Sequence, residues 1–221
     1  MSADEPLEPA VSQALLTVLT TEHFTLQGAR GATISESSAR AALFVGAVSS
    51  ALIALGFIAQ TSELGRSFDI FALVVLPTLW ALGIFTFARL VESSIEDLLY
   101  GRAINRIRHF YRELAGDQAR YLLLGGSDDV GGVLANMGLA RPSRWQLFFG
   151  LASMIAVLDA VVAGAVSAVA AGTAGAPLGI AAGIGGTAAG CSCFGCLAWQ
   201  RKAHIDAAEG AEVLFPSTRR P

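Results

Sequence analysis

Asp159 stands near the middle of an otherwise uncharged, apolar stretch that runs from Trp145 to Gly172. A carboxylate at bilayer depth costs at least about 2.5 kcal/mol, so such acids mostly face a bundle interior or a polar pathway. No Lys or Arg falls at the same predicted depth, which favours a protonated carboxyl hydrogen-bonded to Ser49 or Thr187 over a buried ion pair. In a water-filled pore the carboxyl would be ionised. Asp159 is therefore the first candidate for ion or proton handling, with a packing hydrogen bond between helices as the alternative.

Each of the other apolar stretches also has a polar feature near its middle. Pro77 cannot donate a backbone hydrogen bond and leaves the carbonyl of Leu73 free, which predicts a kink. Small residues recur at heptad-like spacing beside Asp159, and such a face suits contact with other helices or a narrow lumen; they are Ala152, Ala156, Ala163, Val166 and Ala170. The predicted ion or proton pathway consists of Asp159, Ser49, Ser50, Thr78, Thr187 and Ser167.

The last apolar stretch is rich in glycine at a spacing that lets helix backbones approach closely. Gly179 and Gly183, and then Gly186 and Gly190, are each four residues apart. In a membrane this small-xxx-small spacing promotes helix contact where no water-driven force exists between helices. These glycines, with Pro77, are the predicted helix-packing residues, and they predict tight contact inside the bundle or between protomers of a homo-oligomer.

Three cysteines in this stretch, with a histidine downstream, raise the question of a metal site. On a continuous helix Cys191 and Cys193 point about 200° apart, and structural zinc needs four converging ligands. We therefore predict that Cys191, Cys193 and Cys196 are small apolar filler in a reducing compartment, with metal binding by them and His204 or redox chemistry as the alternative. No metal and no cofactor is predicted.

Basic residues cluster after the second apolar stretch, at Arg102, Arg106, Arg108 and Arg112. They are predicted contacts for anionic lipid headgroups or for a cytoplasmic nucleotide. The helix that carries them, Val91 to Leu114, is the part predicted to sense a cytoplasmic ligand or partner protein. The alternative is that their charge serves only to orient the chain in the membrane.

A glycine-rich segment further on contains Asp128 and Asp129, which lack the alternating ligand spacing of an EF-hand loop. We predict a solvated turn there. The sequence contains no phosphate loop, dinucleotide fingerprint, nucleophile elbow or HExxH motif, so neither an enzyme nor a nucleic-acid partner is predicted.

Composition places the elements that carry these residues in a lipid bilayer. The 221 residues are 53% hydrophobic and 15% charged, against about 25% charged in ordinary soluble domains. Four hydrophobic runs each approach the ~20 residues that a membrane-spanning helix needs; they are Ala41 to Gln60, Phe68 to Ala88, Gln146 to Ala171 and Pro177 to Trp199. The predicted fold is an all-α, integral membrane four-helix bundle with additional amphipathic cytoplasmic helices.

Arginine placement predicts the orientation, because basic residues near short loops stay on the cytoplasmic side. The segment between the second and third runs holds eight of them: Arg89, Arg102, Arg106, Arg108, Arg112, Arg120, Arg141 and Arg144. The short loops after the first and third runs carry almost no charge. We therefore predict a multi-pass protein of the cell (inner) membrane with both termini in the cytoplasm.

Five segments follow from these runs. Residues 1–38 form an amphipathic lead-in with a helix over Val11 to Arg30, and residues 39–90 form the first hairpin. Residues 91–144 are a cytoplasmic helical segment whose first helix ends near Gly125 and whose short second helix covers Val133 to Leu139. Residues 145–200 form the Gly/Ala-rich second hairpin, and residues 201–221 form a cytoplasmic tail.

Residues 20–60, TTEHFTLQGARGATISESSARAALFVGAVSSALIALGFIAQ, resemble the opening of an uncharacterised group of predicted multi-span membrane proteins from high-GC actinobacteria. This resemblance implies a bacterial source and no particular activity. The order of helix, two-span hairpin and cytoplasmic helix also resembles two-span effector domains of bacterial nucleotide-signalled defence systems, which implies pore formation. The two additional spans depart from that pattern.

Together these features predict an oligomeric inner-membrane channel or pore, lined partly by the third span, in which Asp159 sets cation preference or carries a proton. One alternative is a small proton- or cation-coupled transporter that uses Asp159 as its coupling site. The other is a non-conducting membrane scaffold or regulatory subunit in which Asp159 only fixes helix packing.

Overall fold

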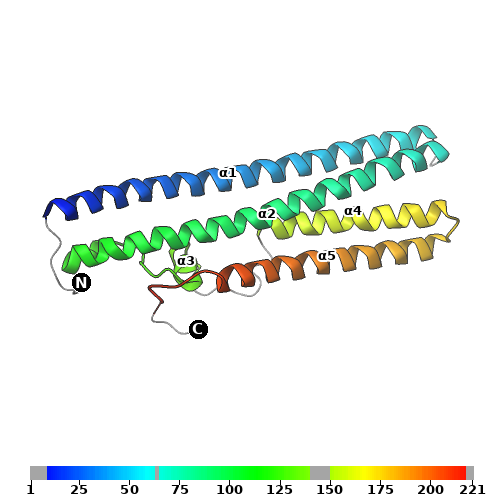
Figure 1. The fold of residues 1–221 in the computed structure, drawn as a ribbon. Helices are drawn as coiled ribbons and strands as arrows, with labels where there is room; N and C mark the ends of the chain where they lie inside the picture. Colours follow the sequence, from blue (N-terminus) through cyan, green and yellow to red (C-terminus); the bar gives the residue numbers. More distant parts are fainter. Residues whose placement is uncertain (1–8, 63–64, 140–149, 218–221) are drawn as a thin grey trace. The chain divides into compact units, whose positions relative to one another are not determined.

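The computed structural model describes residues 9–62, 65–139 and 150–217. Every regular element in this part of the chain is helical, which confirms the all-α prediction (Figure 1). A 3₁₀ turn, η1, covers Gly116–Tyr121, and the five α-helices are α1 (Pro9–Ser62), α2 (Arg66–Ala115), α3 (Val130–Asn136), α4 (Leu151–Thr173) and α5 (Leu178–Glu209).

Four of these helices, α1, α2, α4 and α5, are long and apolar enough to cross a membrane. Their outer surfaces carry large apolar side chains: Leu43 is 74% exposed, and Phe85 and Phe194 are each 75% exposed. Water is a poor solvent for such a surface, whereas hydrocarbon tails are a good one. The four helices therefore indicate a multi-pass membrane protein.

Helix boundaries differ from the predicted ones in three places. The amphipathic lead-in is continuous with the first span as the single helix α1, in which Thr17, Thr21 and Thr25 each donate to the carbonyl four residues earlier. The predicted helix that ends near Gly125 stops at Ala115, because Gly116 adopts a φ of +49° that cannot continue an α-helix. The short helix α3 begins three residues earlier than predicted, where the Asp129 carboxylate accepts from the Gly132 N–H as an N-cap.

Other predictions fall on residues that the structure does not describe. The structure does not describe Arg141, Arg144, Trp145 or the start of the predicted third span, residues 146–149.

Pro77 lies inside helix α2, and the helix continues on both sides of it without interruption.

The chain divides into two compact units, and both α1 and α2 contribute residues to each. Unit 1 comprises the described residues of Met1–Ile34, Glu96–Arg141 and Ala211–Pro221, and unit 2 comprises those of Ser35–Ile95 and Pro142–Gly210. Unit 1 thus holds the polar helix ends with α3 and the tail, while unit 2 holds the most apolar parts of all four long helices.

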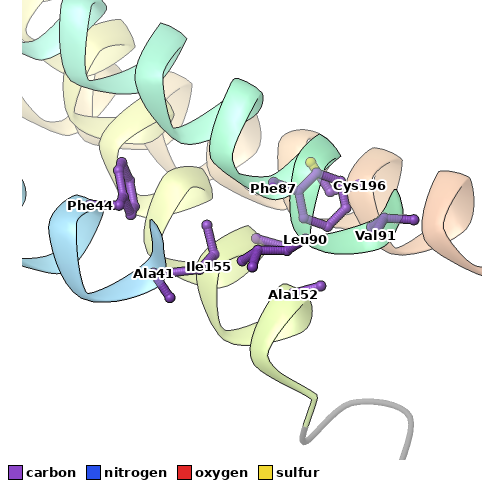
Figure 2. Packing of buried hydrophobic residues seen from close by; sticks show 9 residues of the cluster. Ala41, Phe44, Phe87, Leu90, Val91, Ala152, Ile155 and Cys196 are labelled. Atoms are coloured by element: carbon purple, nitrogen blue, oxygen red, sulfur yellow. The ribbon is translucent and has the colours of Figure 1, made fainter. Parts of the chain in front are cut away.

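The core of unit 2 is built by side chains from four helices (Figure 2). Phe44 of α1 and Ile155 of α4 are almost completely buried, with 1% and 0% exposure. Phe87 and Val91 of α2 and Cys196 of α5 belong to the same cluster. A second cluster packs Leu55 of α1 against residues of α2 and α4. Close packing of this kind is the main force that holds helices together in a bilayer.

Two glycines bring α4 and α5 into backbone contact. A Cβ atom added to Gly164 would lie 2.8 Å from the carbonyl oxygen of Gly185, and one added to Gly185 would lie 2.8 Å from that of Gly164. The connecting turn contains Gly175 at a φ of +92°, which favours glycine. This pair, rather than the predicted glycines, makes the hairpin contact.

The four predicted packing glycines of α5 face away from α4. A Cβ added to Gly179, Gly183, Gly186 or Gly190 would meet no atom within 4 Å. The prediction of tight contact at these positions inside the bundle is therefore wrong, because a side chain there would meet no other helix of the described chain. Their predicted role between protomers stays a prediction.

We expect Gly185→Ala to destabilise the hairpin by about 1–3 kcal/mol, because the new methyl group would collide with the Gly164 backbone. The free energy of unfolding in mild detergent measures this loss. Gly186→Ala is the matched control, since it adds the same methyl group on the adjacent residue where space is open. Equal stability of the two variants would contradict the assigned contact.

Candidate functional site

Asp159 lies near the middle of α4 and is completely buried, with 0% exposure. Its neighbours on the buried face of α4 are apolar, namely Ile155, Ala156, Ala160 and Ala163. The buried face therefore surrounds a single carboxyl group with hydrocarbon. This is the environment in which an ionised carboxylate is most unfavourable.

Space for the carboxyl group comes from Gly83 of α2. A Cβ added to Gly83 would lie 1.9 Å from Oδ1 of Asp159 and 2.9 Å from the ring of Phe44. No residue other than glycine fits there without displacing Asp159. Sequence analysis missed Gly83, although one signal was present: it is the only glycine in the predicted second span.

Neither oxygen of the Asp159 carboxyl group has a hydrogen-bond partner among the described residues. The predicted hydrogen bond to Ser49 or Thr187 is not formed, because both residues are exposed on outer faces of their helices. A buried carboxyl without partners destabilises the fold by about 1–3 kcal/mol even when it is neutral. Its protonated form costs far less than its ionised form.

The remaining predicted pathway residues do not converge on Asp159. Ser50 and Thr78 are exposed, and Ser167 is half-buried. The hydroxyl groups of these three residues, and those of Ser49 and Thr187, each donate to the carbonyl oxygen four residues earlier on the same helix, at 2.8–2.9 Å. The acceptors are Val45, Gly46, Val74, Ala163 and Gly183. The helix thereby satisfies these hydroxyls locally.

A second polar group in unit 2 joins three helices. His204 of α5 has its Nε2 2.9 Å from Oγ of Ser94 on α2 and its Nδ1 2.8 Å from the carbonyl oxygen of Gln200. Oγ of Ser153 on α4 donates to Oε1 of Gln200 at 3.3 Å. Ser153 precedes Asp159 by six residues, about 9 Å along the helix axis. Sequence analysis missed this group, since its members are scattered singly among apolar residues.

The cysteines do not gather into a ligand set. Cys191 is exposed, Cys193 is half-buried and Cys196 is buried in the core of unit 2. Across the described parts of the chain, no three His, Cys, Asp or Glu side chains are close enough to share a metal ion.

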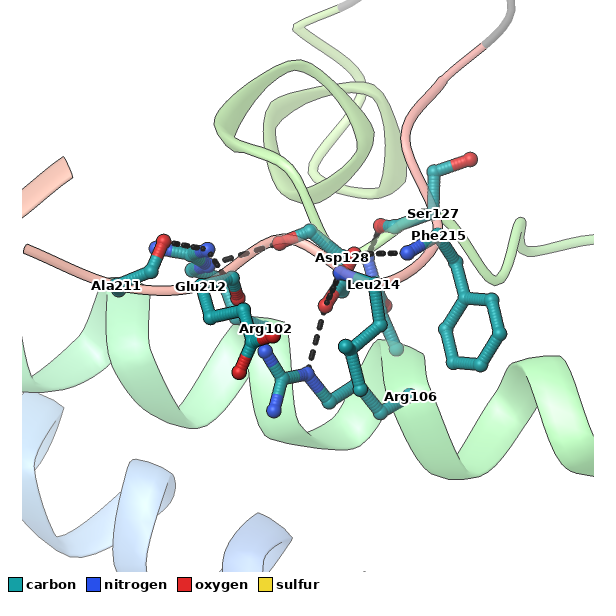
Figure 3. Close-up of polar contacts among 9 residues, drawn as sticks. Arg102, Arg106, Ser127, Asp128, Ala211, Glu212, Leu214 and Phe215 are labelled. Carbon is teal, nitrogen blue, oxygen red and sulfur yellow. Dashed lines mark hydrogen bonds and ion pairs between the residues drawn. The ribbon is translucent and has the colours of Figure 1, made fainter. Parts of the chain in front are cut away.

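In unit 1, Asp128 is the centre of a polar cluster that binds the tail (Figure 3). Its carboxylate is 0% exposed and accepts hydrogen bonds from the backbone N–H groups of Leu214 at 3.1 Å and Phe215 at 2.8 Å. Nε of Arg106 donates to the same carboxylate at 2.6 Å. The ring of Phe215 stacks on His109 with 3.7 Å between ring centroids. The prediction of a solvated turn is therefore wrong at Asp128.

Arg102 and Arg106 bind the polypeptide of unit 1. Arg102 is only 4% exposed and donates to the carbonyl oxygens of Asp128 and Ala211, each at 2.8 Å, and of Glu212 at 3.0 Å. Arg106 also donates to the Glu212 carbonyl. The prediction that Arg102 contacts lipid headgroups is therefore wrong, because its guanidinium group is enclosed by the chain itself. Arg108 and Arg112 are half-buried elsewhere in unit 1.

Hydrogen bonding shifts the acidity of this cluster. Burial alone would raise the pKa of Asp128, but the N–H groups of Leu214 and Phe215 and the Arg106 guanidinium lower it below the ordinary value of 3.8. The folded chain therefore binds this proton less readily than the unfolded chain. The resulting stabilisation is complete above the ordinary pKa and is lost as the pH falls through the lower pKa of the folded form.

No protein-family model matches this sequence, and no curated protein and no solved structure matches it.

We expect Gly83→Ala to destabilise unit 2 by about 1–3 kcal/mol, because the added methyl group would overlap the Asp159 carboxyl. In an Asp159→Ala background most of this loss should disappear, since the overlapping group is gone. The coupling free energy from this double-mutant cycle is the measurement. Gly46→Ala, on an open face of α1, is the control. Additive losses would contradict the contact.

We expect Asp128→Asn to weaken attachment of the tail by about 1.5–3 kcal/mol, because a neutral amide replaces a charged acceptor of three hydrogen bonds. Amide hydrogen exchange at Leu214 and Phe215 measures the effect. In the wild type, attachment should weaken below about pH 3.8, whereas the variant should show little of this pH dependence.

Asp117→Asn serves as the control for charge, because Asp117 is an exposed acid of the same unit. Unchanged exchange rates at Leu214 and Phe215 in the Asp128 variant would contradict the conclusion that Asp128 attaches the tail.

Proposed function

We propose that this protein is a multi-pass membrane transporter of protons, or of a cation coupled to them, and that Asp159 is its binding site. The observation that carries this proposal is the complete burial of Asp159 without a hydrogen-bond partner among the described residues. A role limited to packing would require a partner that offsets the cost of burial. A residue that lowers stability without a local gain is typical of functional sites.

Protonation of Asp159 gives the site two states with different packing preferences. The neutral carboxyl fits the closed contact with Gly83, where a Cβ atom would lie only 1.9 Å from Oδ1 of Asp159. The ionised carboxylate favours a state in which water or a cation reaches it, and therefore a separation of α2 from α4 at this point. Proton binding thus favours an occluded state and proton release an open one, as coupled transport requires.

The polar group formed by Ser94, Ser153, Gln200 and His204 supports access to this site. It shares helices α2 and α4 with the carboxyl site and includes a histidine, a side chain that can exchange protons. By the predicted orientation it occupies the cytoplasmic end of the bundle. Protons would enter from this end when the contact at Gly83 opens.

An oligomeric channel is the second candidate, and the outward-facing residues support it. Ser49, Ser50, Thr78 and Thr187 are exposed, and the four glycines of α5 border open space. A lumen lined by these residues would have to form between protomers, because Asp159 itself is occluded within one chain. In this candidate Asp159 influences conduction only through packing.

Proton flux into liposomes that contain the purified protein tests the proposal. Under an imposed pH gradient we expect the wild type to conduct protons and Asp159→Asn to fall to the level of empty liposomes. Asp206→Asn is the matched control, because Asp206 is an exposed acid near the end of α5. Retained flux in Asp159→Asn that is lost in Gly183→Leu would favour the oligomeric channel. Absence of flux from correctly folded wild type would contradict both candidates and favour the scaffold.

A further inference from the structure

Unit 1 contains a cavity of about 300 Å³ that is separate from Asp159 and from the Asp128 cluster. Helices α1 and α2 and the segment that follows α2 all contribute to its lining. The lining residues are His23, Arg108, Tyr111, Arg112 and Tyr121 to Leu124. All of them belong to unit 1, so the cavity is formed within a single compact part of the chain.

The charge in this cavity is positive and uncompensated. Arg108 has no hydrogen bond or ion pair with any residue in the described parts of the chain, and the positive charge of Arg30 repels it. Arg30 itself pairs with Asp97 at 2.6 Å. Among the described residues, Arg112 donates to the carbonyl oxygens of Leu122 and Leu124 alone. No carboxylate lines the cavity.

An unsatisfied polar atom also lies at this site. Nδ1 of His23 is buried and has no hydrogen-bond partner among the described residues, whereas its Nε2 lies 2.9 Å from Nε2 of Gln27. The ring of Tyr111 stands edge-on to the imidazole, with 5.7 Å between centroids. Buried polar atoms are almost always paired in native proteins, so the unpaired Nδ1 marks His23 as a lining residue with hydrogen-bonding capacity to spare.

We propose that this cavity binds a phosphate group, held by Arg108 and Arg112 with His23 beside them. Guanidinium groups bind phosphate oxygens through paired, charge-assisted hydrogen bonds. The volume lies at the lower end of the range for small-molecule sites. The rim suits a phosphate that carries an apolar part, because Tyr121 and Leu123 are 73% and 95% exposed beside it. A lipid headgroup and a free phosphate share this chemistry.

Thermal unfolding of the full-length protein in neutral detergent distinguishes the two sources. Inorganic phosphate and mixed micelles with phosphatidic acid are the two probes, with chloride at equal ionic strength and phosphatidylcholine as their blanks. A rise in melting temperature with inorganic phosphate identifies a site for the free anion. A rise with phosphatidic acid alone identifies a lipid headgroup site. No rise above either blank overturns the proposal.

Variants then test the assigned residues. Arg108→Gln should weaken binding of the active probe about tenfold or more, because one charged hydrogen-bonding group is lost. Arg108→Lys keeps the charge and should retain part of the affinity. Arg201→Gln removes an equal charge from an exposed position of unit 2 and should leave binding unchanged. Equal weakening in Arg108→Gln and Arg201→Gln would show general charge attraction and overturn the site.

Discussion

Close backbone approach at glycine is the constraint on which unit 2 depends. In lipid, helices gain no water-driven attraction to one another and associate through close packing. Gly164 and Gly185 allow the backbones of α4 and α5 to touch. Because Gly83 of α2 has no side chain, the carboxyl group of Asp159 fits against α2 at that point. A methyl group at any of these positions would force the helices apart. The position of the buried carboxyl group thus depends on the absence of side chains on its neighbours.

Unit 1 is held together by a different interaction, the hydrogen bonding of a buried carboxylate. Asp128 receives two backbone N–H groups of the tail and the guanidinium of Arg106, while Arg102 binds carbonyl oxygens from both the loop and the tail. Charges inside a protein require this degree of compensation. Asp159 contrasts with it: Asp128 has three hydrogen-bond donors, whereas Asp159 has none among the described residues. The first is explained by structure alone, and the second calls for a function.

Sequence patterns predicted the features of the fold that depend on neighbouring residues in the chain. Apolar run length predicted the four long helices, and the lone acid among uncharged residues predicted that Asp159 would face the interior of the bundle. The partners of these residues could not be predicted, because contact depends on the rotation of each helix about its axis. Gly185 and Gly186 are adjacent in sequence, yet one meets Gly164 and the other meets nothing. Likewise, the prediction of a solvated turn at Asp128 was wrong because residues 214 and 215, far along the chain, donate hydrogen bonds to the Asp128 carboxylate.

The attachment of the tail has a consequence for the order of events during synthesis. Asp128 and its arginines leave the ribosome well before Ala211 to Phe215, since α4 and α5 lie between them in sequence. Domains usually fold as their residues emerge, but this cluster lacks its acceptors and donors until α5 has been made. Unit 1 therefore completes only after the second hairpin has been synthesised. Any interruption of translation within α4 or α5 would leave a nascent chain in which Asp128 lacks two of its three hydrogen-bond donors, the N–H groups of Leu214 and Phe215.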